Sequence, residues 1–286
     1  MKKSQPDPDQ SLPICLRALR LPTFVTYHAE VAQRAEKEGW SFKQYLSYLA
    51  ELELSERRTR RIARLMKASQ LPLEKTMATL NKSRLAPKVR RQLPTLCQGD
   101  FVGRAENLLA FGLPGRGKSH LVSAIGHELV QKGISVLFTR AYALVQELLV
   151  AKKELSLERK LKKLDRIDAV ILDDIGYIQQ DRQEMEVLFT FLAERYERRS
   201  VIITSNLIFS KWDQIFKDPM TTMAAVDRVV HHSTMLELTG PSYRSEEAEK
   251  RNQSNIGDDR KEDITETQED TTEAEDDRGR REGAER

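Results

Sequence analysis

Cysteine and long apolar runs are both scarce in this chain of 286 residues. Its two cysteines, Cys15 and Cys97, are too few for a disulfide framework and lack the spacing of metal ligands, so a reducing compartment is expected. No segment approaches the ~18 uninterrupted apolar residues of a membrane span. The first residues also lack the apolar stretch of an export signal. These absences predict a soluble cytoplasmic protein that does not contact a membrane.

Negative charge is concentrated at one end of the chain. From Ser245 to Arg286, sixteen Asp and Glu stand against eight Lys and Arg, so this segment carries about −8 although the whole chain carries +3. The rest of the chain is therefore basic, which favours an anionic polymer as a partner. The acidic segment has too few apolar residues to offset its ordering entropy, and we expect residues 245–286 to be disordered. It could compete with nucleic acid or simply improve solubility.

A glycine-rich motif lies near the middle of the chain. Residues 112–119 fit G-x-x-x-x-G-K-[ST] and follow the apolar run 107–111, which predicts a strand, a phosphate-binding turn and a helix from about Lys118 to Lys132. Glycines let backbone N–H groups surround a polyphosphate, and the helix directs its positive end at the same anion. Lys118 would then contact the β- and γ-phosphates, and Ser119 would hold Mg²⁺. A chance match remains the alternative, but the strand before and helix after argue against it.

The residues before this motif fall into three parts. We expect residues 1–10 to be disordered, residues 11–70 to be helical, and residues 71–99 to be a linker with short helical pieces because they contain three prolines. Ser41 and Gln44 have the form of a capping box that starts a helix. That helix contains an arginine-rich stretch, whose candidate DNA-binding residues are Arg57, Arg58, Arg60, Arg61, Arg64 and Lys67. On charge alone, a solvated helix face fits this stretch equally well.

The pattern from residue 100 to residue 244 alternates between strands and helices. We expect strands at 107–111, 135–139, 169–173, 200–204 and 233–238, and helices at 118–132, 141–163 and 183–198. Strands separated by helices of crossover length predict a parallel sheet with helices on both faces. The fold class is therefore α/β, with a small all-α domain before the nucleotide-binding domain.

Two acids and an amide follow the predicted strands. Asp173 and Asp174 end the apolar run 169–172, and Asn206 follows the run 200–204. The carboxyl ends of parallel strands line the ligand crevice, so these side chains should lie near the phosphate-binding loop. Asp173 would help to hold Mg²⁺, and Asp174 would orient or deprotonate the attacking water. Asn206 would donate a hydrogen bond to the γ-phosphate or the water, although asparagine is also common in turns.

Several motifs in one order resemble the IstB-type ATPases. That family contains transposition helpers encoded beside the transposase of bacterial insertion sequences, and it is similar to the DnaC helicase loaders within the AAA+ ATPases. The resemblance covers about Leu12 to Arg244 and excludes the acidic segment. The motifs that carry it are residues 112–121, 171–177, 194–206, 226–232 and 242–244.

The resemblance implies an oligomer with ATP between neighbouring subunits. By position, Asn206 is similar to the sensor residue, Arg228 to the arginine that one subunit presents to its neighbour's γ-phosphate, and Arg244 to a second phosphate-sensing arginine. The family's activity implies ATP and Mg²⁺ as cofactors, with duplex DNA and a transposase as partners. The candidate nucleotide-binding residues are Gly112, Leu113, Pro114, Gly115, Arg116, Gly117, Lys118, Ser119, His120 and Arg244.

This chain departs from the family pattern at two positions, and other functions compete. Arg116 stands where a small residue is usual, and Asp174 is shorter than the glutamate of most AAA+ ATPases, so slow hydrolysis is expected. A DnaC-like helicase loader is the main alternative, but the arginine-rich helix favours a DNA-binding helper. A small-molecule phosphotransferase would need an acceptor pocket and an arginine-bearing lid, and neither is evident between Ser119 and Asp173.

Overall fold

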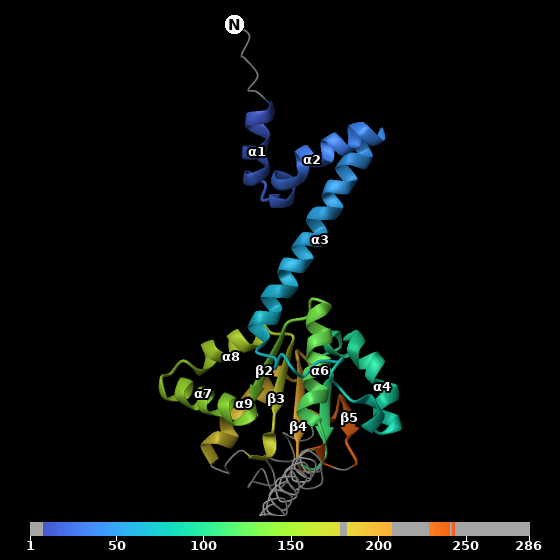
Figure 1. Ribbon diagram of the computed structural model, residues 1–286. Coiled ribbons are helices and arrows are strands. Elements are labelled where there is room, and N and C mark those ends of the chain that lie inside the picture. Colours follow the sequence, from blue (N-terminus) through green and yellow to red (C-terminus); the bar gives the residue numbers. More distant parts are fainter. Residues whose placement is uncertain (1–7, 178–181, 208–228, 241, 244–286) are drawn as a thin grey trace, which may run out of the picture.

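The computed structural model describes residues 8–177, 182–207, 229–240 and 242–243. A group of helices at the amino-terminal end is joined to an α/β core by one long helix (Figure 1). Arg228, Arg244 and the acidic segment 245–286 lie outside the described residues, so the expectations for them stay predictions. Within the described ranges, no helix combines the length and the apolar character needed to cross a bilayer.

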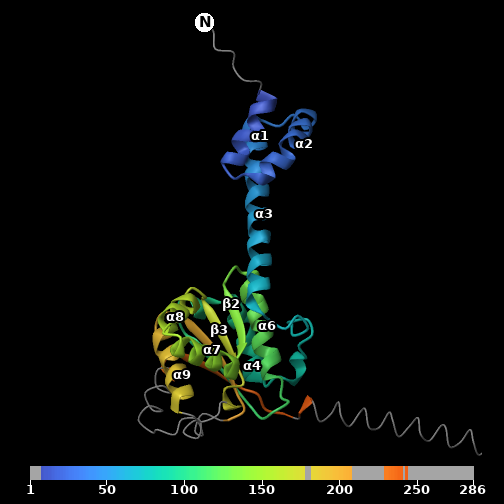
Figure 2. The same ribbon diagram turned by 90° about the vertical axis from the view of Figure 1, so that its left-hand side faces the viewer.

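Three helices form the amino-terminal part: α1 (Pro8–Ala18), α2 (Pro22–Glu38) and α3 (Phe42–Ser69). The predicted capping box is present, because the Ser41 hydroxyl accepts from the Gln44 N–H and the Gln44 side chain accepts from the Ser41 N–H. With 28 residues, α3 is about 42 Å long. It packs against α2 at its outer end and against the α/β core at its base (Figures 1 and 2).

A buried carboxylate connects α2 to α3. Glu53 is 3% exposed, and its Oε2 accepts from the Thr23 N–H in the first turn of α2, which has no side-chain cap of its own. Arg57 Nε donates to Glu53 Oε1 at 2.6 Å, and the Arg57 guanidinium also donates to the Arg20 carbonyl. Desolvation by burial opposes the charged form, but the hydrogen bonds from Arg57 and Thr23 outweigh it and lower the pKa of Glu53. The carboxylate is therefore a cap supplied from another helix.

The core contains a parallel sheet of five strands within the described residues. They are β1 (Asn107–Phe111), β2 (Val136–Arg140), β3 (Ala169–Asp173), β4 (Ser200–Ser205) and β5 (Ser233–Glu237). Their order across the sheet is β2-β3-β4-β1-β5, and every pairing is parallel. Each expected strand is present to within one residue, which confirms the predicted α/β class.

Helices cover both faces of this sheet because the central strands are apolar on both sides. On β1, Leu108 and Ala110 pack into one hydrophobic cluster with α4 (Pro87–Gln98) and α6 (Lys118–Gln131). Leu109 and Phe111 point the opposite way, into a cluster with α7 (Ala141–Lys153) and α9 (Arg182–Arg195). The same alternation occurs on β3 and β4, so one sheet separates two apolar layers.

The segment expected to be a linker contributes to the core. Residues 71–99 contain a 3₁₀ turn (Lys82–Arg84) and α4, and the short α5 (Asp100–Gly103) follows. Leu85, Val89, Leu93 and Leu96 recur at helical spacing and are buried against α6. The prolines suggested a linker, but Pro87 occupies the first turn of α4, where a backbone N–H has no partner within the helix and its absence costs nothing.

The helix expected over residues 141–163 is two helices. α7 ends at Lys153 and α8 spans Leu157–Asp165. Leu155 between them has φ of 54°, a left-handed conformation that ends α7 and turns the chain. The prediction of a single helix was wrong because the turn between α7 and α8 contains no glycine or proline, and charged residues occur evenly on both sides of it.

Glu53→Gln should loosen the connection between α2 and α3. The amide loses the charge that Arg57 pairs with, so we expect α2 to lose about 1 kcal/mol of local stability at pH 7. Because the pKa of Glu53 is lowered, its carboxylate stabilises the fold above the ordinary glutamate range, and this contribution disappears as the pH falls through the lowered pKa. Hydrogen exchange of the α2 amides between pH 3 and pH 7 measures both effects.

The exposed Glu51 on the same helix provides the control, since Glu51→Gln should leave α2 exchange unchanged. Equal exchange in the Glu53 variant and the wild type would contradict the capping role.

Candidate functional site

The predicted site residues meet at the carboxyl ends of three neighbouring strands. Phe111 of β1 is in register with Ser205 of β4, so Gly112 and Asn206 leave the sheet side by side. The Gly112 N–H donates to the Ser205 carbonyl at 3.3 Å. On the other side of β4, Leu172 is in register with Ile203, which places Asp173 beside the last residues of β4. The sheet register therefore brings the loop, the acids and the amide to one edge.

The phosphate-binding loop uses glycine where its backbone requires it. Gly115 and Gly117 have φ of 78° and 82°, in the left-handed region that side chains rarely adopt. A Cβ on Gly115 would also lie 2.1 Å from the Ser242 hydroxyl. α6 begins directly after the loop at Lys118, so its first N–H groups face the loop, as the motif predicted.

Lys118 is held within the loop. Its side chain is buried, and its Nζ donates to the carbonyls of Gly112 at 2.7 Å and Leu113 at 3.1 Å. A buried ammonium is favourable only while its hydrogens have acceptors, and these carbonyls provide two. Phosphate oxygens can take the same position as acceptors with a stronger, charge-assisted bond.

The loop forms one wall of a cavity of about 470 Å³. This volume is within the range of sites that hold small ligands. The phosphate-binding loop lines one side of the cavity, and residues that precede the sheet line the other side. Asp174 and Asn206 lie at its far end. The lining residues are Lys75, Thr79, Leu80, Asn81, Leu85, Pro114, Gly115, Arg116, Gly117, Lys118, Ser119, His120, Asp174, Asn206 and Tyr243.

The two acids occupy different positions. Of the two, only Asp174 borders the cavity that the described residues form. Asp173 lies behind it and accepts a hydrogen bond from the Thr204 hydroxyl at 2.6 Å, while the same hydroxyl accepts from the Asp174 N–H at 2.8 Å. Asp174 has φ of 65°, so the backbone turns left-handed at this residue. Thr204 thus fixes both acids, and Asp174 faces the cavity.

Asn206 closes the far end of the cavity. Its Oδ1 is buried without a hydrogen-bond partner among the described residues, and it lies so close to Gly176 that a Cβ there would be 2.0 Å away. A buried polar atom without a partner is unfavourable unless a ligand or water satisfies it. The Asn206 side-chain oxygen is therefore an acceptor that a donor such as a bound water would satisfy.

Two predicted nucleotide-binding residues also make contacts within the protein. The Arg116 guanidinium donates to the Leu238 carbonyl at 3.3 Å, although Arg116 also lines the cavity. His120 Nε2 lies 3.1 Å from the Thr79 hydroxyl and 3.2 Å from the Thr76 carbonyl. His120 thereby connects the first turn of α6 to the segment that precedes the sheet.

Three contributions to the site were missed from the sequence. Thr204 is a polar residue in an otherwise apolar buried strand, and that was the available signal. Tyr243 donates its N–H to the Gly115 carbonyl and packs its ring against the Arg84 guanidinium, 4.4 Å from the ring centroid. The segment 75–85 supplies the opposite wall. Tyr243 lies within the motif 242–244, but its contacts with the loop, like those of the segment 75–85, depend on the fold.

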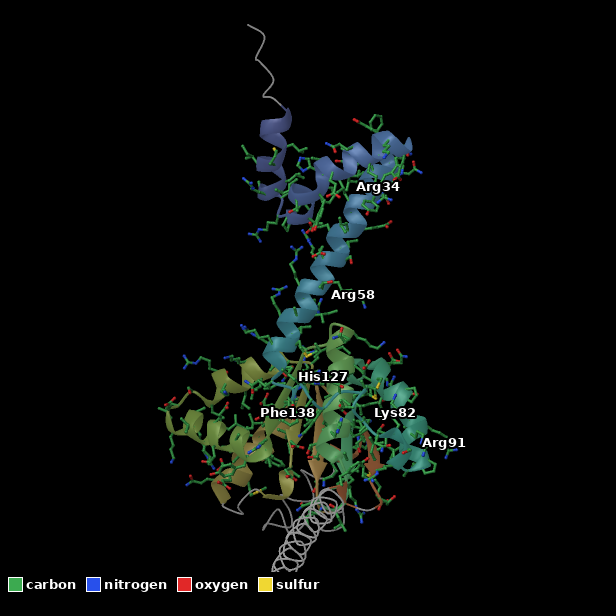
Figure 3. The ribbon with its side chains drawn as sticks, in the orientation of Figure 1. Arg34, Arg58, Lys82, Arg91, His127 and Phe138 are labelled. Carbon is green, nitrogen blue, oxygen red and sulfur yellow. The ribbon has the colours of Figure 1, made fainter. Side chains whose placement is uncertain are left out.

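The predicted DNA-binding residues on α3 divide into two groups. Arg57 and Arg60 pair with Glu53, and Arg61 donates to the Gly133 carbonyl at 3.1 Å, just beyond the end of α6. The other three make no hydrogen bond or ion pair with residues that the structure describes, and they are exposed: Arg58, Arg64 and Lys67. Figure 3 shows Arg58 on the middle of α3, away from the core.

Comparison with known proteins finds a family and relatives that match most of this chain. Residues 14–251 match the family described as IstB-like ATP binding protein. A protein of Sinorhizobium fredii named as an insertion sequence ATP-binding protein is 45% identical over 238 residues, which cover 83% of this chain and 80% of the relative. The IS5376 ATP-binding protein of Geobacillus stearothermophilus is 35% identical over 229 residues, covering 80% of this chain and 91% of that protein.

A solved structure supports the fold. Domain III of the Thermotoga maritima replication initiation protein DnaA aligns with a TM-score of 0.51 and 19% identity, covering 66% of this chain and 77% of that chain. Such a likeness concerns the fold alone, a parallel α/β domain with a phosphate-binding loop. The family match over residues 14–251 and the 45% identical relative show that this chain belongs to the IstB-like ATP-binding proteins, as its motifs predicted.

Proposed function

We propose that this protein is an ATP-dependent helper of DNA transposition. It binds and hydrolyses ATP, assembles on duplex DNA without reading its sequence, and recruits or stimulates the transposase encoded by the same element. One observation carries the proposal: a phosphate-binding loop, an acidic strand end and the Asn206 side chain meet at one cavity in a chain whose relatives are named for insertion sequences.

Nucleotide binding follows from what the loop can offer an anion. Lys118 exchanges the carbonyls of Gly112 and Leu113 for phosphate oxygens, and the first N–H groups of α6 face the same anion. The Ser119 hydroxyl lines the cavity and would hold the Mg²⁺ that neutralises phosphate charge. Asp173, which lies beside the cavity-lining Asp174, would hold the same ion directly or through a water. His120 keeps the start of α6 in place through its contacts with residues 76–79.

Hydrolysis needs a group that orients water and extra positive charge at the γ-phosphate. Asp174 borders the cavity and is held by Thr204, so it orients the attacking water or accepts its proton. Asn206 lines the same cavity, and its side-chain oxygen, which has no partner among the described residues, can accept a hydrogen bond from that water. We assign the extra positive charge to Arg228 of a neighbouring copy, which gives ATP a position between subunits, and a secondary sensing role to Arg244.

DNA binding is assigned to the exposed cations of α3. Arg58, Arg64 and Lys67 lack a competing intramolecular partner among the described residues, whereas Arg57, Arg60 and Arg61 hold the fold together. Flexible cations on a helix surface contact phosphates and carry no base readout. The chain should therefore bind duplexes of any sequence.

Replacing the loop lysine should remove nucleotide binding. We expect Lys118→Ala to lower ATP affinity at least tenfold, about 1.4 kcal/mol, because the phosphates lose a buried ammonium. Isothermal titration calorimetry with ATP and Mg²⁺ measures this change. Lys132→Ala, at the other end of α6 and paired with Gln98, is the matched control and should bind ATP normally. Equal affinities in both variants would contradict the assignment of the cavity.

Replacing the cavity acid should separate binding from hydrolysis. Asp174→Asn keeps the shape of the side chain but cannot accept the water's proton, so kcat should fall by about 10²–10⁴-fold with ATP affinity little changed. Phosphate release under saturating ATP gives kcat. Asp100→Asn, an exposed aspartate at the start of α5, should leave kcat unchanged. Wild-type turnover in Asp174→Asn would rule out its role with water.

The exposed cations of α3 should contribute to the salt dependence of DNA binding. For an arbitrary duplex, log K should fall with log salt concentration, and replacing Arg58, Arg64 and Lys67 by Ala should make that slope shallower by up to ~0.9 for each phosphate that the variant no longer neutralises. Fluorescence anisotropy of a labelled duplex at several salt concentrations measures the slope.

A control variant should remove three cations that are already paired with carboxylates. These are Arg34, Arg104 and Lys152, which contact Glu38, Glu106 and Glu186. Its slope should stay close to that of the wild type. Identical slopes in the α3 variant and the wild type would exclude α3 from the DNA surface.

A further inference from the structure

Helix α8 has a concentration of positive charge that the nucleotide site does not use. Arg159, Lys163 and Arg166 follow one another at spacings of four and three residues, so they share one face of the helix and its C-terminal end. None of the three makes a hydrogen bond or ion pair with another residue in the described part of the chain. Three like charges on one face repel one another, and an anionic partner would relieve that repulsion.

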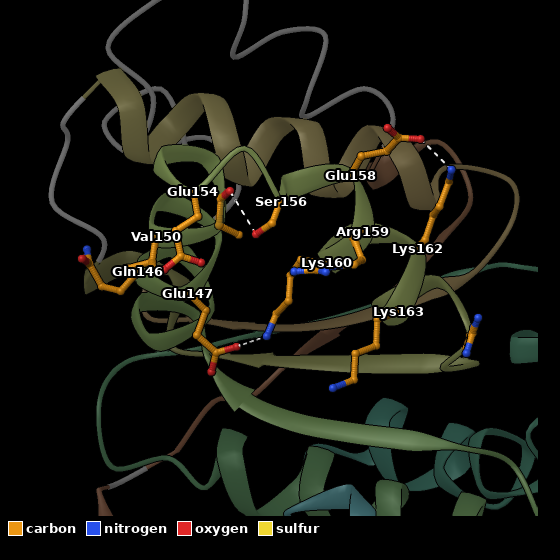
Figure 4. A pocket seen from close by; sticks show the side chains of 12 residues that line it. Gln146, Glu147, Val150, Glu154, Ser156, Glu158, Arg159, Lys160, Lys162 and Lys163 are labelled. Atoms are coloured by element: carbon orange, nitrogen blue, oxygen red, sulfur yellow. Dashed lines mark hydrogen bonds and ion pairs between the residues drawn. The ribbon is translucent and has the colours of Figure 1, made fainter.

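The other lysines of α8 are different because each has an acidic partner. Lys160 Nζ lies 2.5 Å from Glu147 Oε2 of α7, and Lys162 Nζ lies 2.6 Å from Glu158 Oε1. Figure 4 shows both contacts, and it shows Lys163 extending from the helix without one. The same short helix thus carries two neutralised cations and three uncompensated ones.

These cations border a broad hollow between α7 and α8. Its volume is about 1020 Å³, and its walls include the three cations, the apolar Val150 and Ala151, and three acids (Figure 4). Two of these acids are the partners of Lys160 and Lys162, and the third is Glu154. The hollow lies far from the phosphate-binding loop, which belongs to a different cavity. A nucleotide at the loop therefore does not account for the charge on α8.

The position of α8 is fixed by a buried arginine. Arg195 of α9 is 2% exposed and donates to the carbonyls of Leu164, Ile167 and Ser200 at 2.9–3.0 Å. Burial lowers the pKa of Arg195 to about 10, which still leaves it charged at neutral pH. Arg195 thereby holds the C-terminal end of α8 against the sheet, so the basic face is presented by a rigid element.

α8 and the base of α3 lie at the same end of the core. Both views show α8 level with the point where α3 meets the sheet, near the amino-terminal ends of β2 and β3 (Figures 1 and 2). α3 packs against β2 at its base, and β3 begins four residues after α8 ends. The exposed Arg64 and Lys67 occur in this part of α3. Two separate basic elements therefore border one edge of the molecule.

We propose that α8 is a second phosphate-binding surface for duplex DNA, which continues the surface on α3. Arg159 to Arg166 spans about 10.5 Å along the helix, and one DNA strand carries a phosphate every ~3.4 Å of axis. This length covers about three such intervals, so the three cations lie along a run of about four phosphates of one strand. This inference rests on the proposed DNA-binding function and locates a further part of its surface.

The test compares two full-length variants that lose the same net charge. One is Arg159→Ala, Lys163→Ala and Arg166→Ala, and the other is Lys152→Ala, Lys160→Ala and Lys162→Ala, whose lysines all have carboxylate partners. Anisotropy of a labelled arbitrary duplex, measured from low to high salt with ATP and Mg²⁺, gives the slope of log K against log salt concentration.

We expect the magnitude of the slope to fall by up to ~2.7 in the first variant, at ~0.9 per phosphate, and by less than one third of that amount in the second. Exposed arginine and lysine in a helix tolerate Ala, so folding should be preserved, and unchanged ATP affinity verifies it. Arg159→Lys with Arg166→Lys keeps the charge and should retain the wild-type slope.

Equal slopes in the two alanine variants would overturn the inference, since only the total charge would then matter. DNA affinity as high in the Arg159, Lys163 and Arg166 variant as in the wild type would also overturn it. These outcomes differ from a failure of the proposed function, in which the wild-type chain itself does not bind duplex DNA and the α3 variant shows no effect.

Discussion

The nucleotide cavity depends on the parallel hydrogen-bonded register of β3, β4 and β1. Because β1 lies between β4 and β5, the phosphate-binding loop leaves the sheet directly beside the end of β4. β4 in turn pairs with β3, so the acids arrive one strand further along. A slip of one residue in either pairing would reverse the direction of every side chain on that strand and remove Thr204 from the acids. The apolar layers on both faces of the sheet hold this register.

Much of the fold could be predicted from the sequence because its signals are local. Central strands that are buried on both faces occur as short apolar runs, and the loop motif has a fixed order of glycines followed by Lys118. The capping box at Ser41 is likewise contained in four residues. Such features depend on neighbours in the chain, so spacing alone is enough to place them.

The remainder depends on contacts between distant parts of the chain. Asp173 and Asp174 occupy different positions because of the Thr204 hydroxyl, 30 residues away from Asp174, and the left-handed turn at Asp174. Residues 71–99 have the composition of a linker. That α4 packs against α6 and covers one face of the sheet can be seen only in the folded structure. In the same way, the sequence does not indicate which arginines of α3 form ion pairs with Glu53 or donate a hydrogen bond to the Gly133 carbonyl.

One helix connects the two ends of the core. α6 begins at the phosphate-binding loop, and the Gly133 carbonyl just beyond its last turn accepts from Arg61 at the base of α3. The aligned peptide dipoles of a helix make its first turn attractive to anions and its last turn attractive to cations. A triphosphate and the Arg61 guanidinium would therefore be opposite counterions of a single helix. Arg61 is therefore coupled through α6 to the nucleotide site at the opposite end of this helix.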